Sequence, residues 1–140
     1  MLEENKAVVR RWVEEAQNQH RLEVVDEIFA PDIVNHDAPG GFPSPQGADG
    51  IREFFVMMFS AFPDFRAVIH EQIAEGDKVV TRKTVSGTHL GDFMGIPPTG
   101  KRMEVSVIDV VRVVDGKCTD HWSVVDQFGM MQQLGVLPAT

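Results

Sequence analysis

The chain has 140 residues, of which 43% are hydrophobic and 24% are charged, a length and composition that predict one globular domain over residues 1–140. The formal net charge is −8 and the acidic residues are dispersed, which argues against nucleic acid and against an anionic membrane surface as partners. The single cysteine, Cys118, excludes an intrachain disulfide. Because the N-terminus is polar and no segment is apolar enough to span a bilayer, we expect a cytoplasmic protein.

The first half of the chain predicts three helices. Apolar residues recur at helical spacing over residues 4–17, 22–30 and 48–62. The second helix is expected to end at Ala30-Pro31 and the third at Pro63, because proline lacks the N–H that continues a helix. Residues 32–36 predict a short extended segment, and residues 38–47 are rich enough in Pro and Gly to predict a surface loop.

The second half of the chain predicts an antiparallel sheet. After Pro63 the apolar pattern changes to a period of two, which predicts strands over residues 65–75, 78–90, 102–114 and 118–127. Hairpin turns are expected at residues 75–77 and 115–116, and a last helical turn near residues 128–134. Helices followed by an antiparallel meander predict an α+β fold with the helices on one face of a bent sheet.

Asp109 is the most informative candidate for chemistry, because it lies in the most apolar predicted strand. We expect burial to raise its pKa toward the range useful for proton transfer. The alternative is a structural carboxylate, either at a sheet edge or paired with Arg112 or another arginine.

His121 follows the turn at residues 115–116, and a histidine is well suited to exchanging protons near neutral pH. A three-residue loop would place His121 opposite Asp109, whereas a two-residue turn would pair Asp109 with Trp122. Register therefore decides whether Asp109 and His121 can act together. The alternative for His121 alone is a structural histidine.

Further polar candidates lie at segment ends. Asn35, His36 and Asp37 lead into the predicted loop, where they could orient a substrate carbonyl or serve only as turn residues. His89 is a weaker candidate at another segment end, beside Gly91 and Asp92, the latter a possible turn cap. Asp126 could line a cavity or cap the last helical turn. His20 and His70 are expected to be solvated.

No cofactor motif is evident in the sequence. Glycine patterns for a phosphate loop or a dinucleotide site are absent, the His and acidic residues do not form a metal cluster with Cys, and no Gly-x-Ser-x-Gly elbow occurs. We therefore expect chemistry that depends on acids and histidines in a water-poor pocket.

Several segments resemble the SnoaL-like polyketide cyclases, often called ester cyclases, of the ketosteroid-isomerase-like superfamily. They are DIVNH at residues 32–36, AFPD at 61–64, GTHLGDFMGIPPTGK at 87–101, DGK at 115–117, HW at 121–122 and QLG at 133–135. The resemblance covers nearly the whole chain. It implies a cone-shaped α+β barrel, with three N-terminal helices packed on a curved antiparallel sheet that encloses a pocket, and assembly into a homodimer or higher homo-oligomer.

The resemblance also implies a reaction, an intramolecular aldol-type ring closure with neither a metal nor an organic cofactor. By position, it places Asn35, Val107, Asp109, His121 and Ser123 at the cavity. The aromatic polyketide cyclases carry their acid–base carboxylate two positions after the histidine, where this chain has Ser123. A hydroxyl cannot replace a carboxylate as the base, so we predict Asp109 with His121 as the catalytic pair.

The resulting hypothesis is a cofactor-independent enzyme that acts on a small apolar carbonyl compound. Two alternatives stay open on the same fold, because a fold does not fix a function. One is a domain that binds a small ligand without catalysis. The other is an enzyme for hydrolysis, dehydration or isomerisation.

Overall fold

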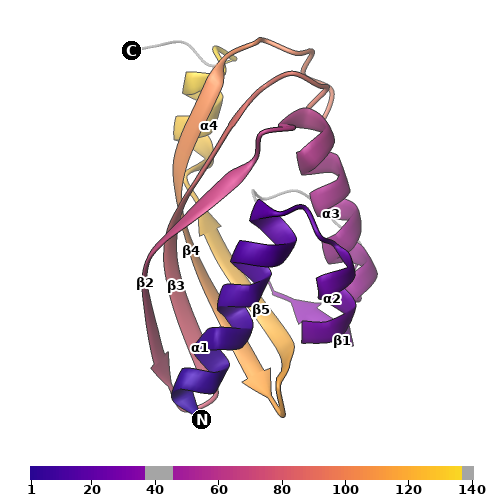
Figure 1. Ribbon diagram of the computed structural model, residues 1–140. Coiled ribbons are helices and arrows are strands. Elements are labelled where there is room, and N and C mark those ends of the chain that lie inside the picture. Colours follow the sequence, from indigo (N-terminus) through magenta and orange to yellow (C-terminus); the bar gives the residue numbers. More distant parts are fainter. Residues whose placement is uncertain (37–45, 137–140) are drawn as a thin grey trace.

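The computed structural model describes residues 1–36 and 46–136, and the predicted α+β fold class is confirmed (Figure 1). The helices are α1 (Leu2–Arg11), the π-helix η1 (Trp12–Asn18), α2 (Glu23–Ile28), α3 (Gly47–Ala61) and α4 (Gln127–Gln133). The strands are β1 (Phe29–Asn35), β2 (Arg66–Glu75), β3 (Lys78–Thr88), β4 (Arg102–Val114) and β5 (Lys117–Val125). Most of the loop predicted at residues 38–47 lies outside the described residues.

The five strands form one open sheet in the order β1-β5-β4-β3-β2. β2 to β5 are antiparallel to their sequence neighbours, but β1 is parallel to β5, so the expectation of a purely antiparallel sheet is corrected at this edge. Antiparallel strands can be joined by a tight hairpin, whereas a parallel pair needs a long connection. β1 and β5 are separated by most of the chain, so no hairpin fixes their direction.

The second helix is shorter than the sequence predicts. It ends at Ile28, and Phe29, Ala30 and Pro31 belong to β1. Ala30 precedes a proline and is therefore biased toward extended backbone. Pro31 cannot donate to a sheet ladder, but β1 is an edge strand, where a proline is tolerated.

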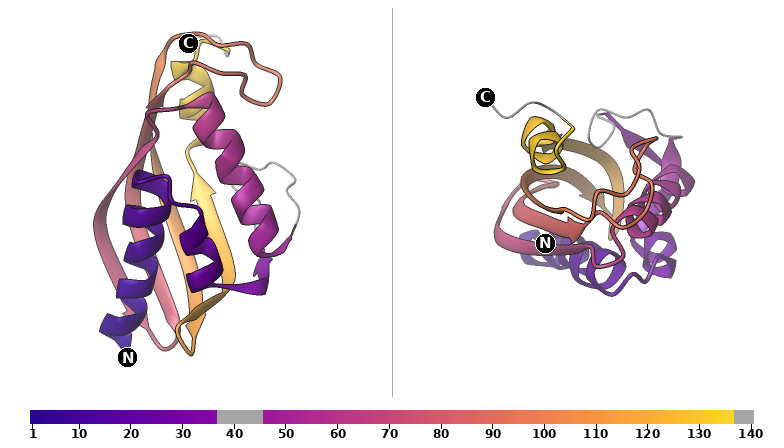
Figure 2. Two further views of the ribbon diagram at one scale, coloured as in Figure 1. Left: turned by 45° about the vertical axis from the view of Figure 1, so that its right-hand side comes forward. Right: turned by 90° about the horizontal axis from the view of Figure 1, so that it is seen from above.

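The helices α1, α2 and α3 cover one face of the curved sheet, and α4 packs against one end of β4 (Figure 2). On β4 the side chains alternate between the helix-covered core and the outer face, as the period-two pattern predicts. Its buried apolar residues are Met103, Val105, Val107, Val111 and Val113.

The helix predicted over residues 4–17 changes its winding at Trp12, where it continues as the π-helix η1. In an α-helix two residues five positions apart are rotated from each other by about 140°. In a π-helix they are linked by the i→i+5 hydrogen bond and lie about one turn apart. Trp12 and Gln17 are thereby both buried on the face turned to the sheet.

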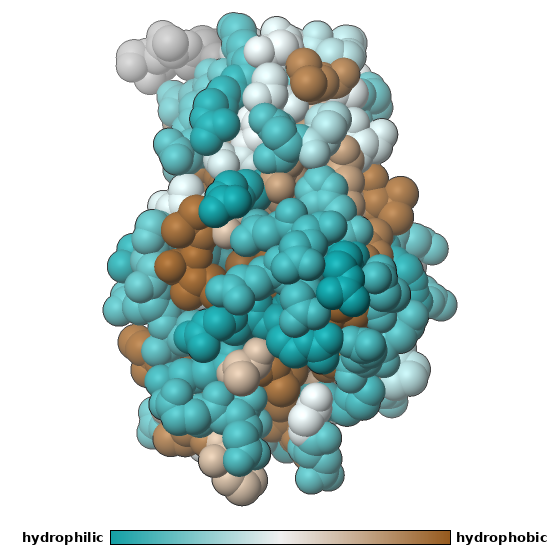
Figure 3. Space-filling view, in the orientation of Figure 1, coloured by the Kyte–Doolittle hydropathy of each residue, from teal (hydrophilic) through white to brown (hydrophobic). Residues whose placement is uncertain are grey.

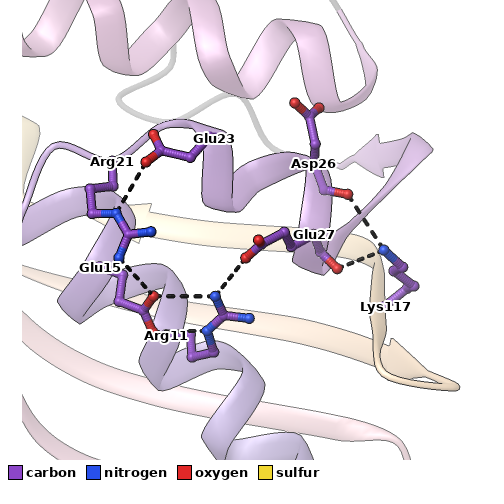
Figure 4. Close-up of polar contacts among 7 residues, drawn as sticks. All are labelled: Arg11, Glu15, Arg21, Glu23, Asp26, Glu27 and Lys117. Atoms are coloured by element: carbon purple, nitrogen blue, oxygen red, sulfur yellow. Dashed lines mark hydrogen bonds and ion pairs between the residues drawn. The ribbon is translucent and has the colours of Figure 1, made fainter.

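A network of charged side chains joins the N-terminal helices on the surface (Figure 4). Arg11 contacts Glu15 at 2.8 Å and Glu27 at 2.6 Å, which ties α1 to η1 and to α2. Lys117, at the start of β5, donates to the backbone oxygen of Glu27 at 2.6 Å and so binds the end of α2. Such exposed ion pairs contribute little stability individually.

Seen from the side of α1, the surface is mostly hydrophilic, and its apolar residues form separate small patches (Figure 3). Within residues 1–36 and 46–136, no helix has the length and apolar character needed to cross a bilayer.

Candidate active site

A cavity lies between the helices and the inner face of the sheet. Most of its wall is apolar. The polar residues of the wall are Gln17, Asn35, Lys83, Asp109, His121 and Ser123, and the others are Trp12, Gly50, Ile51, Phe54, Phe55, Met58, Phe65, Val85, Phe93, Val107, Val125 and Met130. The cavity thus brings together five of the residues predicted to face it: Asn35, Val107, Asp109, His121 and Ser123.

Asp109 is the centre of a buried polar cluster in this wall. Its side chain is 3% exposed, and one carboxylate oxygen lies 2.6 Å from Lys83 Nζ. The other oxygen accepts a hydrogen bond from His121 Nε2 at 3.2 Å. Asp109 therefore has a cationic partner and a histidine partner within the core, and both come from neighbouring strands.

The pKa of Asp109 is lowered, in contrast to the rise that the sequence predicts. Burial alone raises this pKa, but the nearby charge of Lys83 and the hydrogen bond from His121 together outweigh it. Arg112, the partner considered from sequence, instead contacts Asp77 at 2.7 Å on the exposed side of the sheet. Asp109 is consequently a carboxylate that stays ionised inside an apolar wall.

His121 bridges Asp109 and β1. Its Nδ1 lies 3.1 Å from Asn35 Oδ1, and its ring is nearly perpendicular to that of Trp12, with the ring centroids 5.2 Å apart. An oxygen therefore faces each ring nitrogen, and in any tautomer the ring can donate at least one hydrogen bond. Asn35 is held in place because its backbone N–H donates to Gln46 Oε1 at 2.8 Å.

The register that brings His121 to the cavity is neither of the two considered from sequence. Asp109 pairs with Ser123, and His121 pairs with Val111. The hairpin turn has two residues, but a bulge at Thr119 adds one unpaired residue to β5. A one-residue shift moves a side chain to the other face of a sheet, so the bulge turns His121 inward, diagonally across from Asp109.

His36 lies outside the cavity. The sequence-based prediction that it binds substrate is therefore corrected. Its ring stacks on Trp122 at a centroid distance of 4.3 Å, and its Nε2 donates to Asp120 at 2.9 Å. His36 directly follows Asn35, the last residue of β1, and its backbone N–H still donates to the His121 oxygen at 2.9 Å. The alternation of the strand therefore directs its side chain to the outer side. Asp37 lies outside the described residues.

Two other candidates also lie away from the cavity wall. His89 is fully buried behind Phe93, and its Nδ1 accepts a hydrogen bond from the backbone N–H of Thr99 at 3.3 Å. Asp126 is the N-cap of α4 and accepts from the Gly129 N–H at 2.9 Å. His89 thus belongs to the packing of the β3–β4 connection, and Asp126 to the start of a helix.

The remaining histidines and Asp92 have local partners. His20 contacts the backbone oxygen of Phe65 at 3.3 Å and stacks on a phenylalanine ring, so it is not simply solvated. His70 is exposed and contacts Thr84 at 2.6 Å. Asp92 accepts from the Gly95 N–H at 3.2 Å, as a turn cap does.

Sequence reasoning missed Lys83, Gln17 and Trp12 as cavity residues. Lys83 is 3% exposed and shares the inner face of β3 with Thr81 and Val85. A period-two reading of residues 79–85 could have flagged it, because it interrupts an otherwise uncharged inward face. Gln17 had no such signal, since its direction depends on η1. The described residues include no group of three or more His, Cys, Asp or Glu arranged to hold a metal ion.

Comparison with known proteins agrees with this architecture. The SnoaL-like polyketide cyclase family profile matches residues 7–134. The chain is 30% identical over 129 residues to the aklanonic acid methyl ester cyclase DnrD of Streptomyces peucetius, covering 91% of this chain and 88% of that protein.

Two further relatives differ in the activity with which they are associated. The nogalonic acid methyl ester cyclase of Streptomyces nogalater is 30% identical over 129 residues, covering 86% of this chain and 90% of that one. The crystal structure of AclR, a candidate hydroxylase of Streptomyces galilaeus, superposes with a TM-score of 0.87 at 33% identity, covering 100% of this chain and 86% of AclR. From the profile match and these identities, the chain belongs to the SnoaL-like polyketide cyclase family.

Proposed function

We propose that the protein is a cofactor-independent cyclase that closes a ring in a small, largely apolar carbonyl compound of the polyketide methyl ester type. The observation that carries the proposal is a buried network of polar contacts in the wall of an apolar cavity, which links Lys83 to Asp109, Asp109 to His121 and His121 to Asn35. An enclosed apolar site with a few convergent polar groups is typical of a small-molecule site.

The reaction needs two proton transfers. A proton leaves the carbon next to one carbonyl, the resulting enolate carbon attacks a second carbonyl, and the new alkoxide takes up a proton. Among the described residues of the wall, Lys83, Asp109 and His121 are the titratable side chains. Asp109 is ion-paired with Lys83 and its pKa is lowered, which makes it a weak base. We therefore assign the proton exchange with substrate to His121, at the ring nitrogen that faces the neutral amide of Asn35, and to Asp109 the stabilisation of the charge that His121 gains.

Asn35 is suited to orient the substrate carbonyl. Its Oδ1 faces His121, whereas its Nδ2 has no hydrogen-bond partner in the described part of the chain. That amide can donate to a carbonyl oxygen as it becomes an enolate, next to the imidazole that moves the proton. Ser123 lines the same wall, and its hydroxyl supplies a second polar contact but no base.

The test uses aklanonic acid methyl ester, the compound for which the relative DnrD is named. We expect the wild type to convert it to an isomer, because an intramolecular aldol closure leaves the mass unchanged. The double variant Asp109→Asn with Lys83→Met should lose at least about 100-fold in turnover, the usual contribution of acid–base groups. Both substitutions are made together because Asp109→Asn alone would leave Lys83 buried without its counter-charge.

Asp49→Asn is the matched control, because the Asp49 side chain is 86% exposed on α3. The turnover of this variant should stay within about twofold of the wild type.

Mass spectrometry separates the alternative functions. A product heavier by one oxygen would replace ring closure by hydroxylation, the reaction class associated with AclR. Tight binding without any product would assign the cavity to ligand binding, and full turnover by the double variant would exclude Asp109 from catalysis.

The same proposal includes a homo-oligomer in the cytoplasm, with two copies meeting through the outer face of the sheet. On that face Ile108 and Val124 are paired across β4 and β5, and Val124 is 72% exposed. An apolar pair in the middle of an exposed sheet face favours contact with a second copy over contact with water.

The proposed location in the cytoplasm is supported by the cysteine. The single cysteine, Cys118, is buried and unpaired, as expected for a reducing compartment.

A further inference from the structure

Two buried N–H donors of the cavity wall have no hydrogen-bond partner within the described residues. They are Nε1 of Trp12 and Nε2 of Gln17, and these residues are 3% and 1% exposed. Buried polar groups are nearly always satisfied, so an unsatisfied donor calls for a specific explanation. Both residues line the cavity, where a bound molecule could supply the missing acceptor.

The local backbone directs both side chains to the same place. Trp12 and Gln17 are five residues apart in η1, and the π-helical winding stacks them on one face. With α-helical winding, Gln17 would be rotated away from Trp12 by about 140°. π-Helical segments are rare and are often found at functional sites, and this one turns a second donor toward the cavity.

Lys83 joins the two donors into one cluster. Its Nζ lies 4.7 Å from the centroid of the Trp12 ring and donates to Gln17 Oε1 at 3.4 Å. The Gln17 amide therefore has its oxygen directed to Lys83 and its N–H₂ group left over. The hydrogen-bonding groups that the cluster leaves unsatisfied are all donors. The cluster therefore fits an acceptor oxygen and disfavours a ligand group that is itself a donor.

We propose that Trp12, Gln17 and Lys83 form a second polar subsite. This subsite binds a substrate oxygen that carries no proton, such as the carbonyl oxygen of a ketone or quinone. The oxygen it binds is a different one from the carbonyl oxygen held by Asn35. The substrate is then a compound with at least two carbonyl oxygens on an apolar frame. The inference deepens the proposed function by naming this second oxygen, but the binding itself does not depend on turnover.

The experiment compares two ligands with the same three-ring frame, 9,10-anthraquinone and anthracene, by tryptophan fluorescence titration. The wild type should bind the quinone about tenfold more tightly than the hydrocarbon, as one or two added hydrogen bonds imply. Gln17→Glu keeps the oxygen that accepts from Lys83 but replaces the N–H₂ donor by a second acceptor oxygen. Trp12→Phe keeps an aromatic ring but removes the indole N–H. Both variants should reduce the preference for the quinone at least threefold.

Gln19→Glu, at the exposed C-cap of the same helix, is the matched control, and it should keep the wild-type preference. Thermal melting distinguishes a ligand subsite from a structural role. Because the two donors are unsatisfied in the free protein, Gln17→Glu and Trp12→Phe should melt within a few degrees of the wild type while binding the quinone less tightly.

The outcomes separate the two proposals. A wild type that does not prefer the quinone, or a preference unchanged in both variants, overturns the second subsite even if the ester is cyclised. A preference that both variants weaken, in a protein that never converts aklanonic acid methyl ester, supports the subsite and refutes the cyclase assignment for that compound. Variants that bind less tightly only because they melt far below the wild type would assign Trp12 and Gln17 to the fold and overturn the subsite.

Discussion

At the scale of single side chains, Asp109 and Lys83 form a buried pair in which each member depends on the other. Taken alone, a carboxylate in a strand of valines should be hard to ionise. Lys83, 2.6 Å away, reverses that expectation. A buried pair of this kind adds little net stability compared with apolar residues, but removing one partner is costly. The two charges are therefore best read as a unit that keeps a fixed dipole beside His121.

The pair predicts a specific acid sensitivity. The folded-state pKa of Asp109 is depressed, so its contribution to stability is full above the unfolded pKa of about 3.9 and is lost as the pH falls toward the folded value. Between about pH 4 and pH 2 the free energy of unfolding of the wild type should fall more steeply than that of the double variant Asp109→Asn with Lys83→Met, by up to about 1.4 kcal/mol per pH unit. Urea denaturation at a series of pH values measures this, with Asp49→Asn as the control. Parallel curves for wild type and double variant would contradict the assignment.

At the scale of elements, two irregularities build the site. The bulge at Thr119 gives β5 the extra residue that turns His121 inward, and the π-helical winding of η1 turns Gln17 inward. The regular parts of β4 and β3 then supply Asp109 and Lys83 by simple alternation. Irregular backbone thus decides which polar residues reach the cavity, which accords with the frequent presence of bulges and π-helices at functional sites.

The short helix α4 depends on its cap. Asp126 accepts from the Gly129 N–H at 2.9 Å, and α4 carries Met130 to the cavity wall. Asp126→Ala should lower the free energy of unfolding by about 1 kcal/mol, whereas Asp126→Asn should stay near the wild type, because asparagine also caps well. Chemical denaturation measures both. Equal losses in the two variants would indicate that the charge of Asp126, and not its capping hydrogen bond, stabilises α4.

At the scale of the whole molecule, the two faces of the sheet have different surroundings. The inner face and the helices enclose the core and the cavity, while the outer face leaves Ile108 and Val124 exposed at adjacent positions. One chain supplies the complete set of Lys83, Asp109, His121 and Asn35. Assembly through the outer face would therefore cover apolar surface without adding a residue to the site.

The proposed dimer is tested with Val124→Glu, which places a charge in the middle of the outer face, where its burial against a second copy would be unfavourable. In size-exclusion chromatography with light scattering, we expect the wild type to have the mass of two chains and the variant that of one. Val56→Glu is the control, since Val56 is 57% exposed on α3. A monomeric wild type, or a variant that stays dimeric, would refute this interface.

The sequence by itself determined the order and type of the main elements and the α+β class, because periodicity and turn residues are local properties. Its resemblance to the family rested on short motifs instead. It also identified three candidates: Asp109 because it interrupts an apolar strand, His121 because it follows the hairpin turn near Asp109, and Asn35 because it ends a segment that leads into a loop. Only the tertiary structure decided the β4–β5 register, the π-helical winding that turns Gln17 inward and the pairing of Asp109 with Lys83. The physical reason is that a single extra residue reverses which face a strand side chain occupies, and that the pKa of a buried carboxylate depends on charges brought in from other strands.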